Sequence, residues 1–436
     1  MPTDPADSLP PLAADEAVRR VARAREVLLA EIHKVIVGQN DLLEQLLIAL
    51  LTRGHCLVRS LPGLAKTLSV ATLARAVHLK FQRVPFTSDL QPSDLTGREV
   101  LIEESTSNRR TYRFVRGPLF TNILLADDFP GAPPQTQATL LQAMQEGQVT
   151  VGGTTYELEA PFFVLAAQNP AERSGVPPMS AAQLDRFMFS IQLGYPSRDE
   201  ERRVVATTMG AEKVDVRPVL RARDLVWIQQ WVRQIPVAGP LVDYAVDLVR
   251  ATRPQTPEAP DFVRQWLAAG AGPRAAQHLL LGAQARALIK GRYTVHAADI
   301  RWVARPVLRH RLSLNGQAEA AGLCLDQVIE RLLQTVPEPS TGEYSTTAPI
   351  LELADDRGGI SSSRARGPVS PAAPLAVPST PVLPTVTNGA GHVSSAPSSS
   401  EPLLPPPALP PASAPRDARQ ADAPRSYSWP PRPSGS

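Results

Sequence analysis

The spacing of hydrophobic positions changes along the chain and predicts where helices give way to strands. From Ala14 to Leu51 apolar residues recur at helical spacing on both sides of the turn VIVGQ (Val35–Gln39). Short apolar runs then alternate with helix-like stretches; these runs are HCLVR, FQRVPF, NILLADD (Asn122–Asp128) and PFFVLAAQN (Pro161–Asn169). Such alternation predicts an α/β fold with a parallel sheet that helices cover on both faces.

Two hairpin-like segments interrupt this alternation. The first, Glu99–Val115, has a polar turn between two strand-like arms. The second, Gln148–Leu158, contains the pair Gly152-Gly153, which is a strong signal for a two-residue hairpin turn. We therefore expect two β-hairpin insertions in the α/β domain.

Helical spacing returns from about Ala222 to Val336 and is then lost, because Pro, Ser, Ala and Thr dominate the rest of the chain. Such a composition buries too little apolar surface to offset its ordering entropy. The stretch PPPALPPA is a solvated segment or, alternatively, a polyproline ligand. The predicted divisions are a flexible N-terminus (1–14), an α/β domain (15–210), a helical domain (211–336) and a disordered tail (337–436).

Composition limits the class of ligand and the cellular compartment. The 45 Lys and Arg residues are interleaved with 42 Asp and Glu, for a net charge of +3, which argues against nucleic acid as the main ligand. The two cysteines are far apart and suggest no disulfide framework, so a reducing cytoplasm is expected. The N-terminus lacks the pattern of a signal peptide, and no run approaches the ~20 apolar residues of a membrane span.

A phosphate-binding loop is predicted at SLPGLAKT, between the run HCLVR and the helix that begins at Lys66. In the consensus G-x-x-x-x-G-K-[ST], backbone N–H groups and the lysine hold the phosphates of a nucleotide. Ser60 and Ala65 replace the two consensus glycines. The expected nucleotide-binding residues of this loop are Ser60, Leu61, Pro62, Gly63, Leu64, Ala65, Lys66 and Thr67.

An acid pair strengthens that prediction. The apolar run that begins at Ile123 ends in Asp127 and Asp128, some sixty residues beyond the loop. At the end of a strand, one carboxylate serves Mg²⁺ and a second orients the attacking water. Loop and acid pair together predict binding of ATP with Mg²⁺.

Several linked motifs resemble the MoxR family of AAA+ ATPases. They are VIVGQ, LPGLAKT, FTSDLQPSDLTG, ILLADD, APPQTQATLLQAMQEGQVT, AAQNP and AQLDRF, followed by GAGPRAAQHLLLGAQARAL and RPVLRHRLSLN. The resemblance covers residues from about 16 to 338. It implies a P-loop AAA+ core, a small all-helical lid and a homo-oligomeric ring, expected to be a hexamer, that remodels or matures a protein client in the manner of a chaperone. Family clients often carry von Willebrand factor A-type domains.

The resemblance also implies roles for individual positions. Val37, Gly38 and Gln39 would border the adenine, and Thr67 and Asp127 would serve Mg²⁺. The catalytic positions would be Asp128; Asn169, which helps place the attacking water; Arg186, an arginine finger that reaches a neighbouring subunit's nucleotide; and Arg274, which couples the lid to the nucleotide.

The chain departs from the family pattern in three places. Asp128 stands where the family has glutamate, FPGAPP (residues 129–134) replaces a stretch like INRAPP, and Ser60 adds a side chain where the loop is tight. Ala65 is expected to matter less because it lies near the start of the helix. A carboxylate displaced by roughly an ångström can cost on the order of a hundredfold in rate. We therefore expect retained ATP binding with hydrolysis that is slow or depends on assembly.

Other functions stay open at this stage. The chain could be a catalytically silent nucleotide switch or scaffold that recruits partners through its tail. It could also be a DNA-associated motor, but the first hairpin mixes acids with bases rather than forming a phosphate track. The residues concerned are Glu99, Glu103, Glu104, Arg109, Arg110, Arg113 and Arg116.

Overall fold

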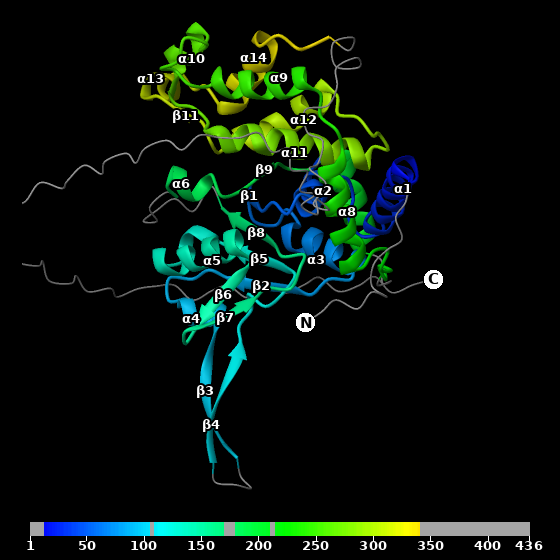
Figure 1. The fold of residues 1–436 in the computed structure, drawn as a ribbon, viewed down its shortest axis with the longest axis vertical. Coiled ribbons are helices and arrows are strands. Elements are labelled where there is room, and N and C mark those ends of the chain that lie inside the picture. Colours follow the sequence, from blue (N-terminus) through cyan, green and yellow to red (C-terminus); the bar gives the residue numbers. More distant parts are fainter. Residues whose placement is uncertain (1–12, 105–108, 170–178, 210–213, 341–436) are drawn as a thin grey trace, which may run out of the picture. The chain divides into compact units, whose positions relative to one another are not determined.

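The computed structural model describes residues 13–104, 109–169, 179–209 and 214–340 (Figure 1). Nearly all of the predicted flexible N-terminus (1–14) and of the predicted tail (337–436) therefore lies outside the described residues. The first unit of the chain, to Gly359, contains every element described below.

A five-stranded parallel sheet with the order β2-β5-β8-β1-β9 forms the centre of the α/β part (Figure 1). Its strands are β1 (Cys56–Ser60), β2 (Phe81–Pro85), β5 (Ile123–Asp127), β8 (Phe163–Gln168) and β9 (Phe189–Leu193). The helices of this part are α1 (Ala14–Ile32), α2 (Asn40–Leu51), α3 (Lys66–Ala76), α4 (Pro92–Thr96), α5 (Pro134–Glu146), α6 (Ala181–Leu184) and α7 (Arg198–Thr208), with a 3₁₀ turn at Phe129–Gly131.

The central strands are apolar on both faces because each face meets its own hydrophobic cluster. In β5, Ile123 and Leu125 join one cluster, whereas Leu124 and Ala126 join the other. Successive side chains of a strand point to opposite faces, so continuous apolar runs are required in a sheet buried on both sides. The predicted doubly covered parallel sheet is confirmed.

One sheet strand is absent from the sequence prediction. β9 pairs with β1 in parallel, from Cys56 opposite Phe189 to Ser60 opposite Leu193. Its sequence FSIQL is short, but it alternates apolar with polar residues, which is the period-two pattern of a strand. The signal was therefore present in the sequence, and burial against β1 and the helical lid agrees with it.

Both predicted hairpins are confirmed. β3 (Gly97–Glu104) pairs with β4 (Arg109–Arg116), and β6 (Gln148–Val151) pairs with β7 (Thr154–Glu157). Gly152 (φ 58°) and Gly153 (φ 79°) supply the two positive φ angles that a tight hairpin turn of the primed type requires.

The two hairpins touch at their bases. The rings of Phe114 (β4) and Tyr156 (β7) stack with centroids 4.3 Å apart, and Phe120 packs edge-on against both. Offset aromatic pairs of this kind contribute beyond their buried area. The hairpins therefore form one connected structure on the side of the sheet next to β2 and β5 (Figure 1).

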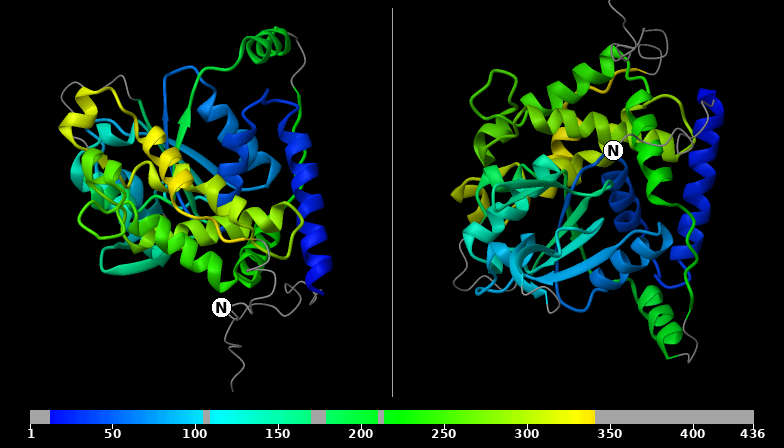
Figure 2. Two further views of the ribbon diagram at one scale, coloured as in Figure 1. Left: turned by 90° about the horizontal axis from the view of Figure 1, so that it is seen from above. Right: turned by 60° about the horizontal axis from the view of Figure 1, so that its bottom comes forward.

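Between residues 214 and 340 the chain is mostly helical, as predicted for about Ala222 to Val336. The elements are α8 (Ala222–Gln234), α9 (Gly239–Arg250), α10 (Asp261–Trp266), α11 (Pro273–Ile289), α12 (Ala297–Leu308), α13 (Gly316–Ala320) and α14 (Leu325–Thr335), with a small sheet of β10 (Leu267–Ala269) and β11 (Ser313–Leu314). α8 lies beside α1, where the Arg20 guanidinium is 5.3 Å from the Trp227 ring centroid; Figure 2 gives two further views of these helices.

The helical part shares its core with the sheet. One hydrophobic cluster runs without a break from the β5 and β9 side chains Leu125 and Ile191 to the α11 and α12 residues Leu279 and Val303. α12 also packs directly against β9. The lid and this side of the sheet consequently form one packed body in this structure.

Charged side chains reinforce the same contact. The Glu44 carboxylate on α2 accepts hydrogen bonds from Arg25 on α1 at 3.0 Å and from Lys290, just after α11, at 2.9 Å. Because Glu44 is buried, its charge requires such partners. Among the residues that the structure describes, no helix has the length and apolar character needed to cross a bilayer.

The buried His55 makes folding stability sensitive to acid. Its Nε2 atom donates to the Met144 carbonyl at 3.0 Å and its Nδ1 atom accepts from the Val164 N–H at 3.0 Å, which requires the neutral ring. Burial lowers the pKa of His55 to about 4. Between these two pKa values His55 is protonated in the unfolded chain but neutral in the native state. The free energy of unfolding therefore falls as pH drops from about 6.5 towards 4.

We expect a His55→Gln variant to lose less stability than the wild type between about pH 7.5 and about pH 5.5, by about 1.4 kcal/mol, because glutamine does not titrate. Urea unfolding at both pH values measures this difference. An identical pH dependence of the two proteins would contradict the assignment.

Candidate nucleotide-binding site

The predicted phosphate loop lies between β1 and α3, as the sequence indicated. β1 ends at Ser60 and α3 begins at Lys66, so the loop delivers Lys66 and Thr67 on the first turn of a helix. The free N–H groups and positive dipole end of that turn favour an anion. Gly63 has φ 83°, a conformation that side chains rarely adopt.

Backbone strain in this loop lies at Ala65 rather than at Ser60. Ala65, which replaces the second consensus glycine, has φ 57°. Ser60 is buried within the end of β1, is free of positive φ, and donates its hydroxyl to the Leu61 carbonyl at 3.1 Å. Our expectation that Ser60 is the more disruptive replacement is therefore wrong for the backbone, because of the two replaced glycine positions only that of Ala65 is left-handed.

A hollow of about 530 Å³ gathers most of the expected phosphate and magnesium residues. Ser60 and Leu61 do not line it. Strands β1, β5 and β8 run in parallel, so their carboxyl ends meet at one edge of the sheet and bring together the loop, the acid pair and Asn169. The lining residues are Pro62, Gly63, Leu64, Ala65, Lys66, Thr67, Leu68, Arg83, Asp127, Asp128 and Asn169.

The donor set of this hollow suits a nucleotide triphosphate with Mg²⁺. Lys66 and the α3 N-terminus offer positive charge and N–H donors for phosphate, and Thr67 and Asp127 offer hard oxygen ligands. Mg²⁺ retains several waters and is held by one or two carboxylates together with substrate phosphates. The residues present therefore fit ATP with Mg²⁺.

Arg83 is a residue of this site that sequence analysis missed. It lies on β2 beside β5, and its Nε atom donates to Asp127 Oδ2 at 3.0 Å, with a second bond from Nη2 to the same oxygen. Only the pairing of β2 with β5 brings the arginine to the acid, forty-odd residues apart in sequence. The cation thus occupies the carboxylate that is expected to serve Mg²⁺.

Asp128 adopts an unusual backbone at the edge of the hollow. Asp128 has a φ of 54° and precedes the 3₁₀ turn Phe129–Gly131. Its carbonyl accepts a hydrogen bond from the Gly131 N–H at 2.8 Å. A Cβ atom at Gly131 would lie 2.8 Å from Asp128 Oδ2, so the carboxylate rests against this turn. Gly131 of the segment FPGAPP thus lies directly against the Asp128 carboxylate.

The turn expected to border adenine is fastened to the phosphate loop. The Gln39 amide donates to the Leu64 carbonyl at 3.3 Å and accepts from the Ser69 hydroxyl at 2.9 Å. Val37 and Gly38 precede it, and a Cβ atom at Gly38 would clash with the Glu200 carboxylate at 2.1 Å. The turn and the loop therefore keep a fixed relation.

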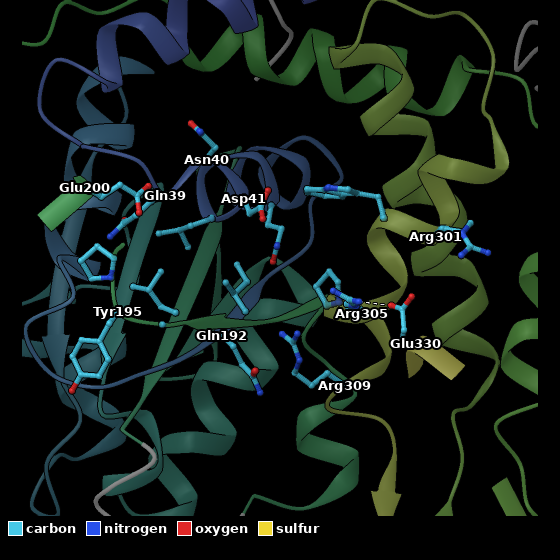
Figure 3. Close-up of a pocket in the computed structure, with 18 of the residues that line it drawn as sticks. Gln39, Asn40, Asp41, Gln192, Tyr195, Glu200, Arg301, Arg305, Arg309 and Glu330 are labelled. Carbon is cyan, nitrogen blue, oxygen red and sulfur yellow. Dashed lines mark hydrogen bonds and ion pairs between the residues drawn. The ribbon is translucent and has the colours of Figure 1, made fainter. Parts of the chain in front are cut away.

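A larger cleft of about 830 Å³ opens beside this turn, between the core and the lid (Figure 3). Gln39, Tyr195 and Glu200 lie on its core side, and Arg301, Arg305 and Arg309 of the α12 region line the lid side. The three arginines are already partnered: Arg301 with the Leu333 carbonyl, Arg305 with Glu330, and Arg309 with Asp326. Val37 also lines this cleft.

The two predicted arginines stand apart from the phosphate hollow. Neither Arg186 nor Arg274 lines it. Arg274, on the first turn of α11, donates to Asp185 Oδ2 at 3.0 Å, so it lies next to the segment that carries Arg186. The Arg186 side chain forms no hydrogen bond or ion pair with the part of the chain that the structure describes.

We expect Ala65→Gly to stabilise the protein by about 0.5–1 kcal/mol, because relief of the left-handed strain exceeds the added freedom of the unfolded chain. Ser60→Gly should instead destabilise it by about 1 kcal/mol, through loss of a hydrogen bond and greater chain freedom. Urea unfolding of both variants measures the difference. The opposite order of stabilities would contradict the location of the strain.

Comparison with known families supports the fold in two blocks. Residues 55–189 match the model of the ATPase family associated with various cellular activities (AAA), and residues 262–332 match that of the AAA lid domain. The first block spans β1 to the start of β9, and the second spans α10 to α14.

Curated relatives extend the likeness over most of the chain. It is 38% identical to Chaperone MoxR1 of Mycobacterium tuberculosis over 354 residues, covering 80% of this chain and 92% of the relative. It is 30% identical to Protein MoxR of Paracoccus denitrificans, covering 71% and 95%. A solved structure of a proposed ATPase from Cytophaga hutchinsonii is similar with a TM-score of 0.70 at 37% identity, covering 75% of this chain and 98% of that one. The chain belongs to the MoxR family of AAA+ ATPases.

Proposed function

We propose that this ATPase binds and hydrolyses ATP with Mg²⁺ to drive chaperone-like remodelling or maturation of a protein partner in the cytoplasm. The observation that carries this proposal is the convergence of Lys66, Thr67, Asp127, Asp128 and Asn169 on one hollow. The likeness to a relative named as a chaperone supports the chaperone role.

Each residue of the hollow has a distinct task in this proposal. Lys66 and the α3 N-terminus hold the β- and γ-phosphates, while Thr67 and Asp127 hold the metal side. Asp128 orients the attacking water as a general base, and the Asn169 amide fixes that water. Mg²⁺, when bound, neutralises charge on the phosphate oxygens.

The remaining catalytic group comes from a second copy of the chain. Arg186 and Arg274 lie outside the hollow of their own subunit, next to each other around Asp185. An arginine that stabilises transition-state charge in trans requires a head-to-tail interface that closes into a ring. We propose a homo-oligomeric ring, a hexamer, in which these arginines face the neighbouring nucleotide.

The two connected hairpins are the proposed client contact. Val100, Leu101 and Tyr112 of β3 and β4 are exposed, and Tyr112 retains 75% of its accessible surface. Exposed apolar side chains on a strand pair can dock a protein surface. The client class that we propose is a protein with a von Willebrand factor A-type domain.

A nucleotide switch with little hydrolysis is the second candidate. Asp128 is one methylene shorter than glutamate, and its carboxylate rests against the turn at Gly131. Such an enzyme would bind ATP and change state without turning over briskly, and its tail would recruit partners.

The Asp128→Glu variant separates the two candidates. We expect it to raise the turnover of the purified assembly about ten- to a hundredfold, because the longer side chain advances the base by roughly an ångström. Phosphate release measures turnover, and Lys66→Ala serves as the inactive control. Brisk wild-type turnover with no gain in Asp128→Glu would contradict the impairment.

Arg83 should compete with Mg²⁺ for Asp127. We expect Arg83→Gln to lower the Mg²⁺ concentration for half-maximal binding of a fluorescent ATP analogue about fivefold, since a half-exposed ion pair contributes up to about 1 kcal/mol. Lys80→Gln, which removes the nearby exposed pair with Glu159, is the matched control and should leave it unchanged. An increased Mg²⁺ requirement in Arg83→Gln would refute the competition.

A further inference from the structure

Lid residues hold the segment that carries Arg186. Arg311, three residues after α12, has a side chain that is only 2% exposed. Its guanidinium donates to the carbonyl oxygens of Asp185 at 3.2 Å, Phe187 at 2.7 Å and Met188 at 3.2 Å. These carbonyls flank Arg186 on both sides.

The same guanidinium is tied equally firmly to the lid. It donates to the Val307 carbonyl on α12 and to His278 Nδ1 on α11 at 2.8 Å. His278 must be neutral to accept this bond, and burial lowers its pKa to about 3. The Arg311 Nε atom donates to Asp185 Oδ1, so all three nitrogens of Arg311 are engaged, which compensates for burying its charge.

Two further lid groups grip the segment. The Asp185 carboxylate divides its oxygens between the two arginines, with Oδ1 accepting from Arg311 at 2.8 Å and Oδ2 accepting from Arg274 at 3.0 Å. His310 Nε2 donates to the Phe187 carbonyl at 2.9 Å. The core contributes its own bond, from the Met188 N–H to the His55 carbonyl at 2.8 Å.

The helix before Arg311 also lines the cleft beside the nucleotide. α12 and its C-terminal end contribute Arg301, Arg305 and Arg309 to the lid wall of that cleft, opposite Gln39 and Tyr195 (Figure 3). α12 and the turn that follows it thus connect the wall of a subunit's own cleft to Arg311, which holds Asp185–Met188. A shift of α12 would move both ends together.

We propose that Arg311 is a positioning residue through which the lid sets Arg186 for the neighbouring subunit's site. The proposal rests on the proposed function, in which Arg186 acts in trans. A change in the nucleotide cleft alters the lid wall, α12 transmits it, and Arg311 moves the segment 185–188. Each subunit thereby couples its own nucleotide state to the arginine that it offers to its neighbour.

Mixed assemblies of full-length chains test the proposal. A finger donor carries Asp128→Asn, which keeps ATP binding but lacks the proposed base, and it keeps Arg186. An acceptor carries Arg186→Ala and keeps its nucleotide site. Neither variant alone should hydrolyse ATP, and the mixture should regain activity. Arg311→Lys is then placed on either partner, because lysine keeps the charge but lacks the fork that holds three carbonyls.

We expect Arg311→Lys on the donor to lower the activity of the mixture at least about tenfold, and on the acceptor to lower it less than about twofold. An equal loss of activity with Arg311→Lys on either partner, or no loss with it on the donor, would overturn the proposed role of Arg311 but not the trans role of Arg186. A mixture of the parent variants that stays inactive would overturn the trans role of Arg186 and the proposal with it.

Two measurements distinguish the expected loss of activity from a folding defect. Thermal unfolding and binding of a fluorescent ATP analogue should match the parents for each double variant. Arg292→Lys, which alters a part-buried lid arginine bonded to Asp299, is the matched control and should show no donor effect. If Arg311→Lys does not fold, Asp185→Asn on the donor replaces it, because this change weakens the contacts of Asp185 with Arg274 and Arg311. Asp185→Asn should lower activity only when the donor carries it. A mixture with unchanged activity would refute the proposal.

Discussion

The parallel pairing of β5, β8 and β1 is the constraint on which the rest of the structure depends. Parallel strands place all their carboxyl ends at one edge, so the phosphate loop, Asp127 and Asn169 meet without any further device. The same pairing buries both faces of the sheet, which explains why its strands are apolar throughout. Fold stability and site assembly therefore have a common origin in this chain.

Burial on one face also joins the lid to the sheet. The hydrophobic cluster of that face continues into α11 and α12, and Glu44 gathers cations from α1 and from the end of α11. In a core packed in this way, side chains are held by many neighbours at once. The segment around Arg186 is held by Arg311 of the lid.

Charge in the site is arranged in competing pairs. Asp127 has Arg83 as a partner, and Asp185 divides its carboxylate oxygens between Arg274 and Arg311. Such pairs hold side chains in defined positions at modest energetic gain.

The sequence by itself determined the doubly covered sheet and both hairpins, because periodicity and turn chemistry are local properties. Its motifs pointed to Lys66, Thr67 and Asp127, and the resemblance to the family pointed to Asn169, which lines the same hollow. The prediction missed β9, whose alternating pattern FSIQL spans only five residues, and its place beside β1 is decided by the tertiary structure. It also misjudged Ser60 and Ala65, because only the backbone shows which of them is left-handed. The sequence could not predict the contacts of Arg83 and Arg311, because their partners Asp127 and Asp185 are distant from them in the chain. Tertiary structure alone decides such pairs, as no local spacing records them.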